Sequence, residues 1–241
     1  MDYDNPPSKT PPERITMASI GRLMLQTFNL EKGVFYTLWG LTLWPEKVIN
    51  VYLFEDRKKA TKPFTFMLMI TAVMAYVTLN IVDFNAMLTD GMVTGDTAEA
   101  QDKQKLVRNI IVDLYNRWFN VLSFTTIPFA ALTTYWFFRR AKYFFAEHLI
   151  INTFIVAYTG VFLIITTIFT PIFGYFIVSL MYFVLSLIYS VYAYGRIFHQ
   201  YTWWQSVPRS TLAFTIYYIL YIFIFAIFIA IAIAIQLNSS K

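Results

Sequence analysis

Five stretches of about twenty apolar residues each dominate this chain of 241 residues. An α-helix rises ~1.5 Å per residue and the hydrocarbon core of a bilayer is ~30 Å thick, so each stretch is long enough to cross it once. The sequence therefore predicts an all-α membrane protein with five transmembrane helices. The predicted spans are Phe64–Val82, Trp118–Phe138, Leu149–Thr170, Ile172–Tyr194 and Thr211–Ile235.

The third and fourth spans form one uncharged run, residues 149–194. As a single helix this run would be ~70 Å long, about twice what a bilayer needs. Pro171 removes a backbone donor and crowds the preceding turn, and Gly174 follows it. We expect the chain to fold back at this point.

Basic residues are spread unevenly between the loops, and this predicts the orientation. If successive loops alternate sides, fourteen lysines and arginines lie on the side of the N-terminus and five on the other. The positive-inside rule then places the N-terminus inside and the C-terminus outside. The formal charge of +5 is interpreted as topogenic charge that also contacts anionic lipid. No nucleic-acid partner is expected.

The chain before the first span divides into two parts. Residues 1–14 are polar and proline-rich and predict a disordered cytoplasmic tail, and residues 15–62 predict an amphipathic interfacial region. The remainder, residues 63–241, is the predicted five-span bundle, with an outer loop at 83–116 that ends as a helix. Thirty residues without cysteine are too few for an independent core, so this loop is expected to be a cap.

Within the interfacial region, residues 33–44 are an apolar run that is too short to span a bilayer. We expect an in-plane collar over residues 33–54, with a re-entrant or broken sixth span as the alternative. Trp39 and Trp44 suit the headgroup level, and the basic cluster Arg57, Lys58 and Lys59 would contact lipid phosphates.

Polar residues inside the spans are uncharged and follow helical faces. On the fourth span they recur at a spacing of four and three residues, which keeps them on one face, and Asn152 lies on the neighbouring span. They either hydrogen-bond between helices or line a cavity for a small solute or a lipid headgroup. On the fifth span, small residues predict close helix packing. The candidate lining is Tyr175, Ser179, Tyr182, Ser186 and Tyr189, and the packing residues are Ala226, Ala230 and Ala234.

Ionisable residues are scarce in the predicted spans. Glu147 and His148 begin the third span, close behind Arg139, Arg140 and Lys142. An ion pair of Glu147 with one of these cations is expected, and a proton relay through the histidine is the alternative.

A metal site and a cofactor are not expected. The chain has no cysteine and two histidines, which removes thiolate ligands and histidine-rich zinc sites. It also has no phosphate-binding glycine loop, nucleophile elbow or HExxH helix.

The segment Phe28–Ile70 resembles a family of uncharacterised Bacteroidota inner-membrane proteins, catalogued as a domain of unknown function. The resemblance is carried by Gly33, Thr37, Leu38, Pro45, Tyr52, Arg57 and Pro63. It extends to Glu147 and His148 in AEHLIIN. Many members begin with a cysteine-based zinc ribbon, which a chain without cysteine cannot form. The resemblance implies a multi-pass protein of a bacterial inner membrane. In architecture, the five predicted spans are also similar to the Yip-type membrane proteins.

Three functions follow as hypotheses. The first is a non-catalytic accessory or scaffold subunit of an inner-membrane assembly, whose partners are membrane lipids and other subunits or a second copy of itself. The second is a small-solute or lipid-handling transporter lined by the polar face of the fourth span. The third is a membrane enzyme centred on Glu147, His148 and Arg140.

Overall fold

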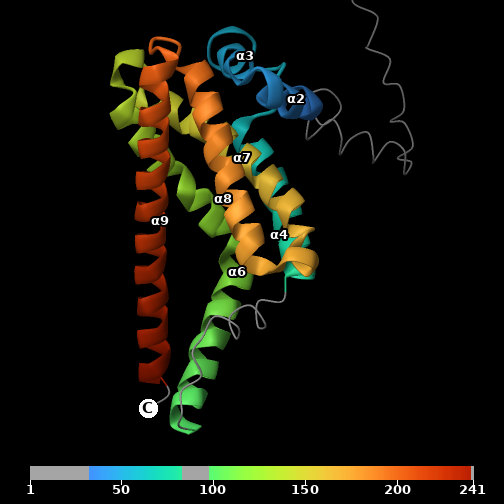
Figure 1. Cartoon of the computed structure of the whole chain (residues 1–241), viewed down its shortest axis with the longest axis vertical. Helices are drawn as coiled ribbons and strands as arrows, with labels where there is room; N and C mark the ends of the chain where they lie inside the picture. The colour runs from blue at the N-terminus through green and yellow to red at the C-terminus, as the bar shows by residue number, and fades with distance from the viewer. Residues whose placement is uncertain (1–32, 83–97, 240–241) are drawn as a thin grey trace, which may run out of the picture.

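The computed structural model describes residues 33–82 and 98–239, and the regular structure in these ranges is helical (Figure 1). The predicted tail 1–14 and the first part of the interfacial region, residues 15–32, lie outside the described residues. The elements are α2 Phe35–Leu43, α3 Pro45–Asn50, the π-helix η2 Val51–Glu55, α4 Pro63–Ile81, α6 Ala98–Phe137, the 3-10 helix η3 Arg139–Ala141, α7 Phe145–Thr167, α8 Thr170–Ile197 and α9 Trp203–Ser239.

Within the described residues, three helices are long and apolar enough to cross a membrane, which indicates a multi-pass membrane protein. They cover Phe145–Thr167, Thr170–Ile197 and Trp203–Ala232. The prediction of five spans is wrong. The predicted first span, Phe64–Val82, corresponds to α4, whose apolar part Pro63–Thr78 is shorter than the three candidate spans.

The predicted second span, 118–138, is the second half of the 40-residue helix α6. Its first half includes residues 98–116, which were predicted as the end of an outer loop. Backbone hydrogen bonding continues from this charged half into the apolar half, because a helix needs no change of structure where its hydropathy changes. Pro128 lies inside α6 without ending it.

The chain folds back between α7 and α8, as predicted. α7 ends at Thr167 and α8 begins at Thr170, with Pro171 in the first helical turn, where its missing N–H has no partner to lose. Gly174 has φ +76° and interrupts the helical conformation. This left-handed backbone is open to glycine and costly for other residues.

α7 is the central helix of the bundle. α4 and α6 pack against it, α8 runs back along it, and α9 packs against α6 and α8 (Figure 1). The approach of α4 to α7 is close at Gly160, where an added Cβ would lie 2.8 Å from Cγ2 of Ile70. The bundle therefore depends on a small residue at this crossing.

The short helices α2 and α3 cover one end of the bundle (Figure 1). The free carbonyls at the end of α2 are bound by tyrosines of α8: the Tyr189 hydroxyl donates to Leu41 O at 3.1 Å, and the Tyr192 hydroxyl donates to Leu43 O at 2.7 Å. The ion pair of Arg196 with Glu46, at 2.6 Å, adds a link from α8 to α3. Helices this short are marginal alone, so tertiary contacts stabilise them.

Candidate ligand-binding pocket

The polar face predicted on α8 does not line one cavity. Tyr189 is bound to α2, Tyr175 is exposed, and Ser179 is half-buried. Ser186 is fully buried, and its hydroxyl has no hydrogen-bond partner among the described residues. Of the predicted lining, Tyr182 alone reaches a pocket.

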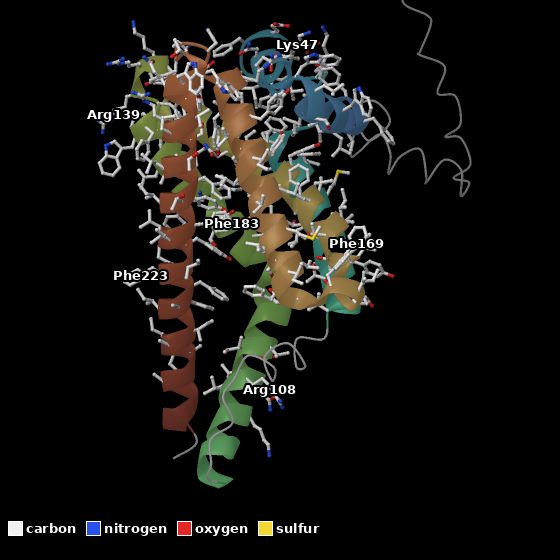
Figure 2. The ribbon with its side chains drawn as sticks, in the orientation of Figure 1. Lys47, Arg108, Arg139, Phe169, Phe183 and Phe223 are labelled. Carbon is white, nitrogen blue, oxygen red and sulfur yellow. The ribbon has the colours of Figure 1, made fainter. Side chains whose placement is uncertain are left out.

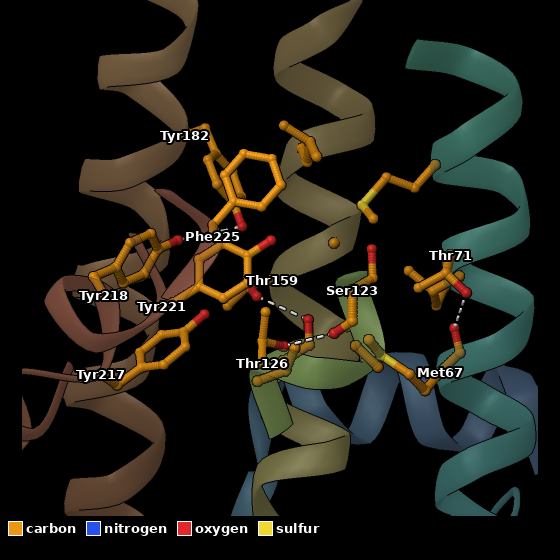
Figure 3. A pocket seen from close by; sticks show the side chains of 16 residues that line it. Met67, Thr71, Ser123, Thr126, Thr159, Tyr182, Tyr217, Tyr218, Tyr221 and Phe225 are labelled. Carbon is orange, nitrogen blue, oxygen red and sulfur yellow. Dashed lines mark hydrogen bonds between the residues drawn. The ribbon is translucent and has the colours of Figure 1, made fainter. Parts of the chain in front are cut away.

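This pocket has a volume of about 270 Å³ and lies between α4, α6, α7, α8 and α9 (Figure 3). Its α7 and α9 residues fall within the two candidate spans Phe145–Thr167 and Trp203–Ala232, so the pocket is at membrane depth. It is lined by Met67, Ile70, Thr71, Met74, Ser123, Thr126, Val156, Ala157, Thr159, Gly160, Leu163, Tyr182, Tyr217, Tyr218, Tyr221 and Phe225.

Tyrosines form one wall of the pocket. Tyr217, Tyr218 and Tyr221 come from α9 and meet Tyr182 of α8 on the same side, as Figure 3 shows. The hydroxyls of Tyr218 and Tyr182 are 3.4 Å apart, longer than the ~2.7–2.8 Å of a good O–H···O bond. A ligand oxygen can therefore compete for these donors.

The opposite walls offer acceptors and apolar surface. Thr71, Thr126 and Thr159 each donate to a carbonyl of their own helix, at 2.9, 2.7 and 2.8 Å. Because each hydroxyl proton is used in one of these bonds, the threonine oxygens can only accept a hydrogen bond from a ligand. Met67 and Met74 of α4 add flexible, polarisable side chains that adapt to an irregular apolar ligand.

Among the described residues that line the pocket there is no aspartate, glutamate, lysine, arginine or histidine. An ion placed there would lose its hydration without gaining a counter-charge, which is costly at membrane depth. The lining therefore suits an uncharged molecule.

A separate buried network joins α6, α7 and α8 around Asn152. The Asn152 side-chain amide donates to Oγ1 of Thr134 and to the carbonyl of His148, both at 2.7 Å, and its oxygen accepts the Tyr194 hydroxyl at 2.7 Å. Since a carbonyl only accepts, these contacts fix which end of the amide is nitrogen. The predicted lining residue Asn152 thus binds helices together and does not reach the pocket.

His148 is part of this network. Thr134 donates its proton to the carbonyls of Ala130 and Ala131, so Nδ1 of His148, at 3.1 Å from Oγ1, is the donor of that pair. The ring stacks on Phe198 with centroids 5.3 Å apart, and Nε2 has no hydrogen-bond partner among the described residues.

Glu147 has a local structural contact. Its carboxylate accepts the Phe144 N–H at 2.7 Å and so caps the start of α7. Among the described residues it forms no ion pair with Arg139, Arg140 or Lys142. Burial, and then the Glu147 charge, raise the pKa of Tyr143, so this hydroxyl stays neutral near pH 7.

The other predicted site residues lie on the surface. Trp39 and Trp44 are exposed, as expected for headgroup-level side chains, and Arg57, Lys58 and Lys59 are exposed next to α4. Ala226, Ala230 and Ala234 are exposed on α9 and do not pack within this chain. In the described part of the chain, no group of three or more metal-binding side chains occurs.

The sequence interpretation missed the tyrosines of α9. Their spacing, two adjacent residues and a third one turn later, was a visible signal, because they are the tyrosines of a helix whose other membrane-depth residues are mostly aliphatic or phenylalanine. Polar aromatics at Tyr217, Tyr218 and Tyr221 need hydrogen-bond partners at membrane depth, and the pocket is where they converge.

Comparison with known proteins identifies one segment of the chain. Residues 31–75 match the family described as "Protein of unknown function (DUF3667)". No curated protein and no solved structure matches the chain. The matched segment covers α2, α3, η2 and most of α4. It therefore includes the helix α2, which Tyr189 and Tyr192 bind, and the α4 wall of the pocket. Residues 31–75 therefore form a DUF3667 family domain.

Proposed function

We propose that this protein binds and handles a neutral, lipid-like molecule inside the membrane. The observation that carries the proposal is the uncharged pocket at membrane depth, with tyrosine hydroxyls on one wall and apolar side chains on the other. A molecule with one carbonyl, ester or hydroxyl group and an apolar body would match both walls.

The pocket's lining narrows the ligand. Its apolar walls suit an acyl or isoprenoid segment, and its tyrosine hydroxyls suit one polar end. A lipid-handling protein of this kind corresponds to the transporter hypothesis, with α9 in place of α8 as the main source of polar lining.

Extraction and mass spectrometry of purified protein test the proposal. The wild type should retain a neutral lipid through mild detergent, and Tyr218→Phe should retain several-fold less, because it loses one donor and keeps the ring. Tyr175→Phe is the matched control, since Tyr175 is an exposed α8 tyrosine outside the pocket. Equal retention by the two variants, or no retained lipid in the wild type, would contradict the proposal.

We further propose that the protein lies in a bacterial inner membrane with residues 33–62 on the cytoplasmic side. The basic residues near this end of the bundle, among them Lys47 and Arg139 in Figure 2, support this orientation. Because the chain has no cysteine, single introduced thiols are clean reporters. Lys59→Cys should react with an impermeant reagent only after the cells are opened, and Ile172→Cys, at the turn between α7 and α8, should react in intact cells. The reverse pattern would refute the orientation.

An accessory or scaffold subunit is the second candidate function. It is supported by α9, because few residues of its apolar part are buried within this chain and the rest are free to contact other subunits as well as lipid. Purification at native expression should then yield one stoichiometric protein partner. A monomer that purifies alone in several mild detergents would count against this role.

A further inference from the structure

The turn between α6 and α7 holds three cations in a fixed conformation. Arg139, Arg140 and Lys142 are exposed, while Phe138 at the start of the turn is fully buried. Phe138 stacks on Phe198 with centroids 4.2 Å apart. The turn is therefore anchored by its apolar residues and presents its charges outward.

Tyr201 brings a fourth cation to this turn. Its hydroxyl accepts the backbone N–H of Arg140 at 3.0 Å, and the Arg209 guanidinium lies 4.8 Å from the centre of its ring. One buried tyrosine thus places a cation of α9 beside the turn, although the two segments are far apart in sequence. We call Arg139, Arg140, Lys142 and Arg209 the basic turn cluster.

Nearby acids do not neutralise this cluster. No member forms an ion pair with a carboxylate among the residues described. Glu147, which starts the next helix, is held by the Phe144 N–H, and Glu46 is paired with Arg196. The cluster therefore keeps its capacity to bind an anion.

Exposed aromatic residues flank the cluster on the adjoining helices. Trp136 near the end of α6 is 64% exposed, and Phe144 before α7 is 76% exposed. Aromatic side chains next to cations at the end of membrane-spanning helices are typical of the headgroup level of a bilayer. The aromatic rings suit the acyl–headgroup boundary, and the cations suit the phosphate above it.

We infer that the basic turn cluster binds the headgroup of one anionic phospholipid. Arginine forms paired hydrogen bonds with phosphate oxygens, and two neighbouring arginines with a lysine match a phosphodiester and a second negative or hydroxyl-bearing group. This site is separate from the uncharged pocket and does not depend on the ligand proposed for it.

The basic cluster at residues 57–59 differs from the turn in its surroundings. Glu55 and Asp56 directly precede it, and the Asp56 carboxylate accepts the Lys58 N–H at 3.0 Å. It has three cations, as many as the turn itself without Arg209, and two adjacent acids, so it attracts an anionic membrane but its charge is partly balanced by these acids. This makes it a matched control.

The test is native mass spectrometry of the full chain, titrated with phosphatidylglycerol and, separately, with phosphatidylcholine. One phosphatidylglycerol should bind in preference to phosphatidylcholine. Each cation near an anionic lipid contributes roughly a fivefold gain in binding, so R139Q/R140Q/K142Q should weaken the first phosphatidylglycerol on the order of a hundredfold. R57Q/K58Q/K59Q removes the same charge and should change this first binding step by less than about fivefold.

R139K/R140K/K142R keeps the charge and loses the paired hydrogen bonds of two arginines, so its affinity for the first phosphatidylglycerol should lie between those of the wild type and R139Q/R140Q/K142Q. Equal weakening by the two glutamine triples would overturn the proposal, because net charge alone would then explain the binding. Displacement of the lipid by inorganic phosphate at low millimolar concentration, or equal binding of the two lipids, would also overturn it.

Discussion

Replacing Asn152 with leucine tests whether buried hydrogen bonds hold α6, α7 and α8 together. The leucine is similar in size and cannot make the three side-chain bonds of Asn152, each 2.7 Å long in the native protein. The substitution leaves the Tyr194 hydroxyl buried without its acceptor. We expect Asn152→Leu to fold and to be markedly less stable.

The magnitude follows from the environment. Hydrogen bonds between membrane helices average about 0.6 kcal/mol and reach about 1.7 kcal/mol. Two of the three bonds join helices, to Thr134 of α6 and to Tyr194 of α8, and together they give a loss of about 1–3 kcal/mol, reduced somewhat by the better burial of leucine in an apolar surrounding. Tyr194→Phe removes one bond of the three and should cost about 1 kcal/mol.

The assay is unfolding by increasing SDS in mixed micelles, followed by tryptophan fluorescence. The double variant Asn152→Leu with Tyr194→Phe should lose less than the two single losses added together, by about 1 kcal/mol, since both remove the same bond. If Asn152→Leu is as stable as the wild type, the network does not hold the bundle. If the two losses add fully, the Tyr194 contact has no energetic role.

Three further substitutions test the packing, and all are measured by the same SDS unfolding. Gly160→Ala places a methyl group 2.8 Å from Cγ2 of Ile70 and should cost about 1–3 kcal/mol by displacing α4; unchanged stability would mean that α4 moves freely. In Gly174→Ala the added Cβ has no neighbour within 4 Å, so the loss of stability of about 1–2 kcal/mol should come from the backbone angle φ +76° alone. A gain of stability would show that Gly174 does not adopt this angle. Glu46→Gln breaks the ion pair with Arg196, whose side chain is 46% exposed, and should lower the stability by less than about 1 kcal/mol. A loss above 2 kcal/mol would mean that this ion pair is needed to hold α3 in place.

The helices that the sequence predicted best are those whose length and composition decide their structure. α7 and α8 match their predicted spans closely, and the break at Pro171 and Gly174 follows from backbone chemistry alone. α6 could not be predicted in this way. Its charged first half and apolar second half form one continuous helix, and hydropathy reports only where a helix can meet lipid.

The candidate site was harder to predict because periodicity identifies a face but not its neighbours. The stripe predicted along α8 meets a different helix at each level: Tyr182 faces α9 and Tyr189 binds α2. Glu147 illustrates the same limit, because its carboxylate caps its own helix, whereas the charge pattern predicted an ion pair with Arg139, Arg140 or Lys142. Only the packing of the bundle shows which hydroxyls converge.

The pocket is tested most directly by photo-crosslinking in bilayers with a neutral acyl lipid that carries a diazirine, followed by peptide mapping. The account predicts label on both walls, at Met67 or Met74 of α4 and at Tyr217 or Tyr218 of α9, and loss of this label on competition with unmodified lipid. Label confined to the outward face of α9, for example at Phe223 and Ile219, would contradict it, because the lipid would then only surround the protein.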